Sequence, residues 1–557
     1  MRAVVAPADL PAAKPMTGVG NAHLTVMATP EAQVWFTQGL NLFHDFWDYE
    51  SAKSFEQAIR VDPNCAMCYW GLYEAQTFRG GWDAYSAAAL EQAKRLKKKA
   101  TPKEQLYIEA AVADRENREG AKDEKDEKAI RLMRKAVAMD PTDLQAKIFL
   151  AGYLDDGYDD GEPKEGTRQA ITVLEEALKA VPDDSAANHY WIHAMEPTNH
   201  PERAIRSAQE LASLAPSSGH MVHMPGHIFY RTGDYASAEK WFAASTAVDE
   251  GYLQAEHVDV DDDWNYVHNL MYRIANLMEE GKFAEAEVVS QRLVAARGRT
   301  MATLYVWAPN DSMTRLSLTL PVAMRQGDWT AVQTMLDKAS PDAKLVNLNF
   351  LAGELKVFAS GMQALKNGNV AAAEVASKKL EADVVAKTPP PAAKVKREKH
   401  PKGPVQEPLD PDAMMPSLVS SLKIMSQELQ AGVALQKKDV AGAKKLFDAA
   451  AEAETKLGYH EPPSLIQPVT EAEGLLLLRA GDVAASHAAY AKALKERPNS
   501  GFELYGEAQA SEAVGNSKLA LDEYALFLDA WKDADAGLPE VKHAREYVAA
   551  HPVLASR

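Results

Sequence analysis

Residues 32–63 read "AQVWFTQGLNLFHDFWDYESAKSFEQAIRVDP", a stretch with aromatic and small residues at fixed intervals. Counted from Ala32 as position 1, tryptophan, glycine, phenylalanine, alanine and proline occupy positions 4, 8, 24, 27 and 32. Apolar side chains three or four residues apart share one helix face, so the stretch predicts two helices joined by a short turn. Glycine permits close contact between them, and proline closes the second helix. The residues concerned are Trp35, Gly39, Phe55, Ala58 and Pro63.

Parts of this pattern recur along the chain. At 557 residues the protein exceeds the about 250–300 residues at which a single core stops growing, so we expect either several domains or one extended repeat array. Turns such as "RTGDY" and "EEGKF" precede alanines at helical spacing, and we count at least seven helical pairs. The recurrences centre on Ala129–Pro141, Ala170–Pro182, Gly226–Phe242, Ala286, Trp329 and Pro498.

These intervals resemble those of the tetratricopeptide (TPR) repeat. The resemblance implies an all-α fold, a TPR-type α-solenoid in which antiparallel helix pairs form a right-handed superhelix. It also implies that the first helix of each pair lines a concave groove and the second forms the outer wall. Alanine, leucine, lysine and glutamate dominate the composition, which favours helices independently.

Proline and charge interrupt the repeats at residues 387–416, "KTPPPAAKVKREKHPKGPVQEPLDPDAMMP". Such a composition predicts a solvated linker or surface loop. We therefore expect an N-terminal extension (1–30), a TPR-like solenoid with a histidine-rich groove (31–386), this linker (387–416) and C-terminal TPR-like repeats (417–557).

Charge and hydropathy exclude two classes of partner. The net charge of −18 repels nucleic acid, and no basic stripe interleaved with aromatic residues offsets it. No apolar run reaches the about 18 residues of a transmembrane helix, so a soluble protein is expected. The start "MRAVVAPADLPAAKPM" is no intact export signal, although a signal already removed would leave the same appearance.

Histidine is concentrated between residues 188 and 230, which hold six of the fifteen in the chain. Spacings of three and four put His189, His193 and Glu196 on one helix face and His220, His223 and His227 on another. The TPR register, carried over from the resemblance, places these residues and His268 on the groove side. Neighbouring helices are then expected to present their imidazoles to one shared space.

Such a space suits a divalent transition metal, because neutral imidazole is a good ligand for zinc and copper. Thioethers of Met221 and Met224 would favour copper, unless they only fill the core, and a Glu196 ligand would favour zinc. A buried polar network without metal is the alternative. The expected metal ligands are His189, His193, His220, His223 and His227.

Two prolines and an acidic run bear on this geometry. Pro197 is expected to end or kink its helix after Glu196, and Pro225 could delay the next helix and leave His220 and His223 in a preceding turn. The run Asp259–Asp263 offers either oxygen ligands or a helix start before Trp264.

Catalysis is a further possibility, although no nucleophile elbow, phosphate-binding loop or dinucleotide fingerprint is present. A metal-dependent enzyme, hydrolytic or oxidative, would use a metal-activated water with Glu196 or His268 as proton acceptor. His44, Trp70 and Trp264 are expected to contact a ligand in the groove. The pair Cys65 and Cys68 is interpreted as small core residues, with a redox or soft-metal pair as the alternative.

The stretches "IHAMEPTNHPERAI" and "SSGHMVHMPGHIFYRTGDY" resemble a widespread group of bacterial TPR proteins with a GHxxHMPxHI-like motif. The resemblance implies no particular activity, and it favours an exported or periplasmic protein over a cytoplasmic one. Two functions stay open: a histidine centre for a metal or small ligand, and a metal-free interaction scaffold that binds a partner peptide in the groove. The sequence names neither a substrate nor an oligomeric state.

Overall fold

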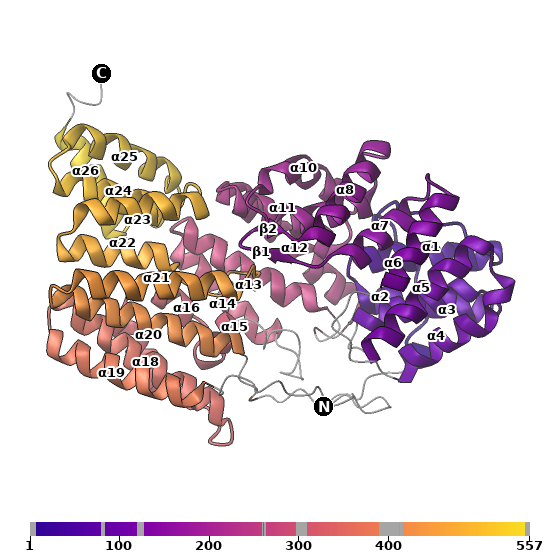
Figure 1. The fold of residues 1–557 in the computed structure, drawn as a ribbon, viewed down its shortest axis with the longest axis horizontal. Coiled ribbons are helices and arrows are strands. Elements are labelled where there is room, and N and C mark those ends of the chain that lie inside the picture. The colour runs from indigo at the N-terminus through magenta and orange to yellow at the C-terminus, as the bar shows by residue number, and fades with distance from the viewer. Residues whose placement is uncertain are drawn as a thin grey trace.

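The computed structural model describes residues 7–78, 84–119, 127–258, 260, 263–296, 309–388, 412 and 416–551. These residues form helices α1 to α26 and one small two-stranded hairpin, and successive helices pack against each other along the chain (Figure 1). The predicted all-α, TPR-type solenoid is confirmed. No helix within these ranges is both long and apolar enough to cross a bilayer.

The first half of the array contains seven hairpins, one of them with a β-hairpin between its helices. Their bounds are α1 (Pro30–His44), α2 (Asp48–Val61), α3 (Ala66–Phe78), α4 (Ala84–Leu96), α5 (Pro102–Glu119), α6 (Glu127–Met139), α7 (Leu144–Leu154), β1 (Tyr158–Asp159), β2 (Glu162–Pro163), α8 (Glu165–Ala180), α9 (Ser185–Met195), α10 (Ile205–Leu214), α11 (Gly219–Arg231), α12 (Tyr235–Glu256), α13 (Trp264–Glu279) and α14 (Phe283–Ala296).

The second half continues the same plan. Its helices are α15 (Pro309–Leu316), α16 (Leu320–Arg325), α17 (Trp329–Lys338), α18 (Val346–Lys366), α19 (Val370–Lys387), α20 (Pro416–Gln436), α21 (Val440–Leu457), α22 (Val469–Ala480), α23 (Val483–Glu496), α24 (Gly501–Ala513), α25 (Ser517–Ala530) and α26 (Pro539–Ala550). Residues 389–411 and 413–415 of the expected linker lie outside the described ranges, and α19 packs against α20 across it.

Glycine and aromatic residues make the close helix contacts that the repeat pattern predicts. A Cβ atom at Gly39 of α1 would lie 3.0 Å from the ring of Phe55 in α2. In the hairpin of α11 and α12, a Cβ atom at Gly226 would lie 2.4 Å from the ring of Phe242. In both hairpins the glycine lets the first helix approach an aromatic ring of the second.

The last helices of the chain return to α13 and α14, and we call this contact the closure of the superhelix. Tyr524 and Trp531 of the C-terminal hairpins share one buried core with residues of α11 to α14. The indole Nε1 of Trp531 donates to the carbonyl of Glu279 at 2.8 Å, and the amide of Asp535 donates to the carbonyl of Gly281 at 3.1 Å. Figure 1 shows the yellow C-terminal stack beside these pink helices.

A buried charge network stabilises this closure. Arg325 of α16 donates to Glu471 of α22 at 2.7 Å and to Glu279 of α13 at 3.2 Å. Glu279 also accepts from Arg497 and from Ser500, each at 2.9 Å. Since α22 follows the loop of residues 458–468, the network holds this loop near α11 and α13. We call residues 458–468 the α21–α22 loop.

Candidate metal centre

Six imidazoles from three consecutive hairpins lie close together. They come from α9, α11 and α13, the first helices of their pairs, and form two groups. The first triad is His189, His193 and His220, and the second triad is His223, His227 and His268; within each triad one nitrogen of every ring lies within 4.8 Å of the others.

The atoms that converge in both triads are the Nε2 nitrogens. In the first triad, the Nε2 of His189 lies 3.0 Å from that of His193 and 3.1 Å from that of His220. In the second, the Nε2 of His223 lies 2.5 Å from that of His227 and 3.1 Å from that of His268. Ligand nitrogens at about 2.0–2.1 Å from a tetrahedral zinc ion are roughly 3.3 Å apart, so most of these spacings are close to those around one ion.

Two asparagines of α13 orient imidazoles of α11. The Nδ1 of His220 donates to Asn265 Oδ1 at 3.1 Å, and the Nδ1 of His223 donates to Asn269 Oδ1 at 2.7 Å. The amide nitrogen of Asn265 donates to Asp249 at 2.8 Å, and that of Asn269 donates to the carbonyl of Phe242 at 2.9 Å. Because the amide nitrogens are occupied in this way, the amide oxygens face the imidazoles.

Glu196, the C-cap residue of α9, orients one imidazole of each triad. Its Oε1 accepts from the Nδ1 of His193 at 2.7 Å, and its Oε2 accepts from the Nδ1 of His227 at 2.6 Å. The Nδ1 of His189 donates to the backbone carbonyl of His44 at 2.6 Å. A carbonyl oxygen only accepts, so this nitrogen carries the proton. Five of the six rings therefore hold a proton at Nδ1 and turn Nε2 toward the triads.

Burial favours the neutral form of His189, His220, His223, His227 and His268. It lowers the pKa values of His189, His220 and His223 well below the ordinary value, and neighbouring imidazoles lower them further. Burial likewise lowers the pKa of His268 to about 3. A neutral imidazole with its proton at Nδ1 has a bare lone pair at Nε2, and two bare lone pairs repel unless a proton or cation lies between them. The donor set therefore fits a transition-metal ion.

Glu461 is a member of this centre that no repeat pattern indicates. It comes from the α21–α22 loop, and its Oε2 lies 3.7 Å from the Nε2 of His268 and 3.5 Å from the Nδ1 of His227. Its carboxylate also lies within 4.8 Å of ligand atoms of His193 and Glu196. Burial, together with the charge of Glu196, raises the pKa of Glu461 well above the ordinary value. No repeat register in the sequence places Glu461 or its neighbour His460.

Aromatic rings cover the first triad. The ring centroid of Phe46 lies 4.7 Å from that of His189 and 5.3 Å from those of His193 and His220. Trp264 lies 5.0 Å from His220 and donates through Nε1 to the carbonyl of Phe46 at 2.9 Å. This places Trp264 beside the histidines, although no ligand contact tests its expected role.

Two residues expected in the groove lie in the core instead. The side chain of His44 is buried against Gln145, 2.5 Å from its Nε2, and burial lowers its pKa to about 4. Trp70 is 1% exposed and packs against Tyr107 and Phe149. Both predictions are wrong, because α1 and α3 turn these side chains into the packing of the first hairpins; only the carbonyl of His44 reaches the centre.

The boundaries of α11 and α13 decide where the remaining residues of the histidine region lie. Pro225 lies inside α11, which begins at Gly219 under a cap from Ser218, so His220 and His223 are helical and do not lie in a preceding turn. Met221 is fully buried in the core, as is Met224, which favours the core interpretation. Asp263 is buried just before α13, while Asp259, Asp261 and Asp262 lie outside the described residues.

The helix α9 ends at Met195, as expected from Pro197. The neighbouring His200 is exposed and pairs with Glu202, so it stays apart from the triads. Cys65 and Cys68 are fully buried and form a disulfide. The two cysteines are therefore core residues, as expected, and they are also oxidised.

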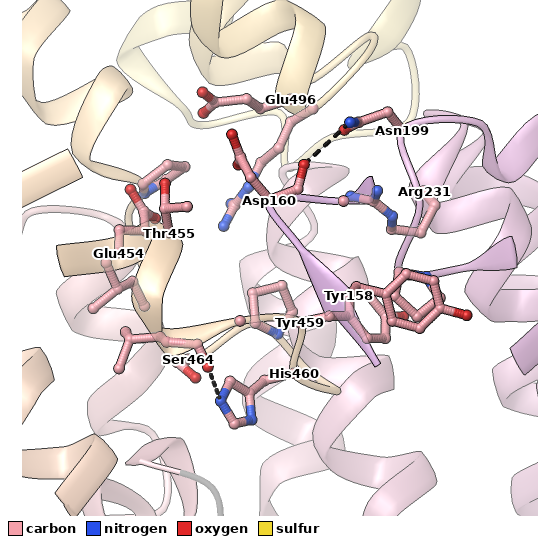
Figure 2. A pocket seen from close by; sticks show the side chains of 18 of the residues that line it. Tyr158, Asp160, Asn199, Arg231, Glu454, Thr455, Tyr459, His460, Ser464 and Glu496 are labelled. Atoms are coloured by element: carbon pink, nitrogen blue, oxygen red, sulfur yellow. Dashed lines mark hydrogen bonds between the residues drawn. The ribbon is translucent and has the colours of Figure 1, made fainter. Parts of the chain in front are cut away.

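A cavity of about 740 Å³ adjoins the second triad. Figure 2 shows Tyr158 and Asp160 of the β-hairpin on one side of it and Tyr459 and His460 of the α21–α22 loop on another. Tyr272 lines the same cavity, and its ring centroid lies 4.7 Å from that of His227. One wall of the cavity therefore contacts the second triad.

Comparisons with known proteins assign no family to the chain. No protein-family model matches it, and no curated protein does. Similar solved structures include yeast Tom70, at 13% identity over 94% of this chain and 98% of that chain with a TM-score of 0.27. The TPR domain of P58(IPK) has 10% identity, coverages of 87% and 99% and a TM-score of 0.19. The Naa15/Naa10 complex bound to HypK-THB has 14% identity, coverages of 93% and 86% and a TM-score of 0.25. These TM-scores are low, so the fold assignment depends on the helix pairs and glycine–aromatic contacts of this chain itself.

Proposed function

We propose that the protein binds two transition-metal ions, one in each histidine triad, with zinc or copper as the ions that imidazole suits. The observation that carries the proposal is the convergence of Nε2 atoms on rings whose Nδ1 protons already have acceptors. Outer hydrogen bonds of this kind fix the tautomer and the orientation of metal-binding imidazoles.

Glu196 is an orienting residue in this proposal. Both of its carboxylate oxygens accept hydrogen bonds from imidazoles, and its side chain is 2% exposed. Burial opposes its ionisation, but His193 and His227 outweigh this effect and hold its pKa well below the ordinary value. A bound ion would supply Lewis acidity or, for copper, redox chemistry. Proton transfer by Glu196 or His268 stays a prediction. The contacts described above favour an orienting role for Glu196 and a ligand role for His268.

Metal content of the purified full-length chain tests the proposal. We expect two zinc or copper ions per chain after loading of chelator-treated protein, measured by elemental analysis and titration calorimetry. His193→Ala should remove an ion from the first triad and His227→Ala one from the second. His200→Ala is the matched control, because this exposed histidine lies outside both triads. A wild-type chain with no affinity for either ion would refute the proposal.

The cavity supports a second candidate function, the binding of a partner peptide. Its lining combines tyrosines of the solenoid with the β-hairpin and the α21–α22 loop, a set that offers both apolar rings and hydrogen-bonding hydroxyl groups. Tyr459→Ala should abolish binding of any peptide selected from a display library against the wild-type chain. Selected peptides that bind the variant equally well would exclude the cavity as their site.

We also infer an exported, periplasmic location. A disulfide between Cys65 and Cys68 persists in oxidising compartments and is rare in the cytosol. Mass spectrometry of the native protein after alkylation should find both thiols blocked from reaction. Alkylated cysteines in freshly isolated protein would contradict this location.

A further inference from the structure

We propose that Glu461 is a bridging ligand between the two triads, so that metal binding fastens the α21–α22 loop to α11 and α13. This inference rests on the proposed function and adds a residue from the far end of the chain to the centre. It makes the closure of the superhelix dependent on metal occupancy.

The proximity of Glu461 to residues of both triads supports the bridging role. Its Oε2 is 3.7 Å from the Nε2 of His268, a ligand atom of the second triad. Its carboxylate is also within 4.8 Å of a ring nitrogen of His193, which belongs to the first triad. A carboxylate has two oxygens and can give one to each of two neighbouring ions. The triads are neighbours, since the rings of His220 and His223 stack at a centroid distance of 5.9 Å.

The two neighbouring carboxylates also favour a bound cation. Glu461 lies beside the carboxylate of Glu196, and its ion-pair partners among the described residues are the rings of His227 and His268. The guanidinium of Arg231 is directed elsewhere, to the carbonyls of Glu196 at 2.9 Å and Thr198 at 2.8 Å. Two buried carboxylates this close repel each other unless a proton or a cation compensates. Two divalent ions in the triads would provide that compensation.

Coordination of Glu461 would also affect the cavity. The loop that carries Glu461 also supplies Tyr459, Pro463 and Ser464 to the cavity lining; Figure 2 shows Tyr459 and Ser464 there. The same loop meets α11 through the ring of Tyr459, over which the guanidinium of Arg231 lies at 5.7 Å. Coordination of Glu461 would therefore fix one wall of the cavity and couple metal occupancy to access by a ligand.

Hydrogen exchange of the full-length chain, followed by mass spectrometry with and without zinc, tests this coupling. We expect zinc to slow exchange of the loop amides by about tenfold or more in the wild-type chain. In Glu461→Gln this slowing should disappear, and the zinc affinity should fall about 10- to 100-fold. Glu452→Gln is the matched control, because this exposed glutamate of α21 pairs only with Lys456 among the described ion pairs and should leave both readouts unchanged.

The outcomes separate this inference from the proposed function. If the wild-type chain binds zinc through the histidines but its loop exchanges at the same rate with and without the ion, the bridging role is wrong. Unchanged zinc affinity in Glu461→Gln overturns it as well. If Glu461→Gln does not fold, the zinc-dependent protection of the wild-type loop and an intermediate affinity in Glu461→Asp decide the question. A wild-type chain that binds no zinc refutes the proposed function instead.

Discussion

Replacing Arg325 with methionine should loosen the closure that brings the α21–α22 loop to the histidines. The Arg325 side chain is 1% exposed and donates to Glu471 at 2.7 Å and to Glu279 at 3.2 Å. Methionine preserves much of the apolar volume and removes the charge, so two buried carboxylates lose their shared partner. Removing one member of a buried ion network costs about 3–5 kcal/mol.

The contacts that Glu279 and Glu471 keep determine where the free-energy cost is expected within that range. Glu279 keeps Arg497 and Ser500, each at 2.9 Å, whereas Glu471 keeps only the amide of Gln467 at 3.0 Å among the described hydrogen bonds. We therefore expect the lower end, about 3 kcal/mol, which corresponds to roughly two powers of ten in an opening equilibrium. Because the effect is local to the closure, amide exchange of α22 should accelerate by about 100-fold, while α2 should keep its protection.

The double variant Arg325→Met with Glu471→Met provides the control. It removes both charges of the stronger pair, and replacing a buried ion pair with apolar side chains is often neutral or stabilising. Most of the protection of α22 should therefore return. Exchange in the single variant within about threefold of wild type, or no recovery in the double variant, would refute the reasoning that this network holds the closure.

Three further variants test the centre, the network and the repeat. Asn269→Leu removes the acceptor of His223 and should lower zinc affinity of the second triad about 10- to 100-fold by calorimetry; unchanged affinity contradicts an orienting role. Burial, with the charge of Glu471, raises the pKa of Glu503 to about 8. The protonated carboxyl therefore stabilises the fold fully below about pH 4.5, and this contribution is lost as the pH rises through 8, so Glu503→Gln should raise the melting temperature more at pH 9 than at pH 6. An equal effect at both pH values contradicts this. Gly226→Ala places a methyl group 2.4 Å from the Phe242 ring and should destabilise its hairpin by about 1–3 kcal/mol in exchange measurements; a neutral effect would mean that the ring moves freely.

The sequence predicts the fold and the histidine faces well because both depend on short-range order. Gly39 and Phe55 belong to one hairpin, so their spacing along the chain determines their contact in space. His189 and His193 share a face by helix geometry alone. The convergence of separate faces needs only that neighbouring hairpins stack in the same register.

What the sequence could not predict depends on contacts between distant segments. Glu461 reaches the triads because the superhelix closes, and no local pattern encodes that closure. His44 and Trp70 illustrate the opposite error, since the repeat register points them inward but the rings of Phe149 and Tyr190 cover them. The expectation for Pro225 was wrong because a cap at Ser218 starts the helix before the proline can matter.

The two triads are not independent sites, because they share a helix and a carboxylate. The helix α11 gives His220 to the first triad and His223 and His227 to the second. Glu196 accepts a hydrogen bond from His193 of the first triad and from His227 of the second. If the triads bind metal as we propose, an ion that orders α11 and Glu196 in one triad would also order ligands of the other, so that a second ion would meet a more rigid site. Linkage would make this effect reciprocal: the affinity that the second triad loses without the first ion would equal the affinity that the first triad loses without the second ion.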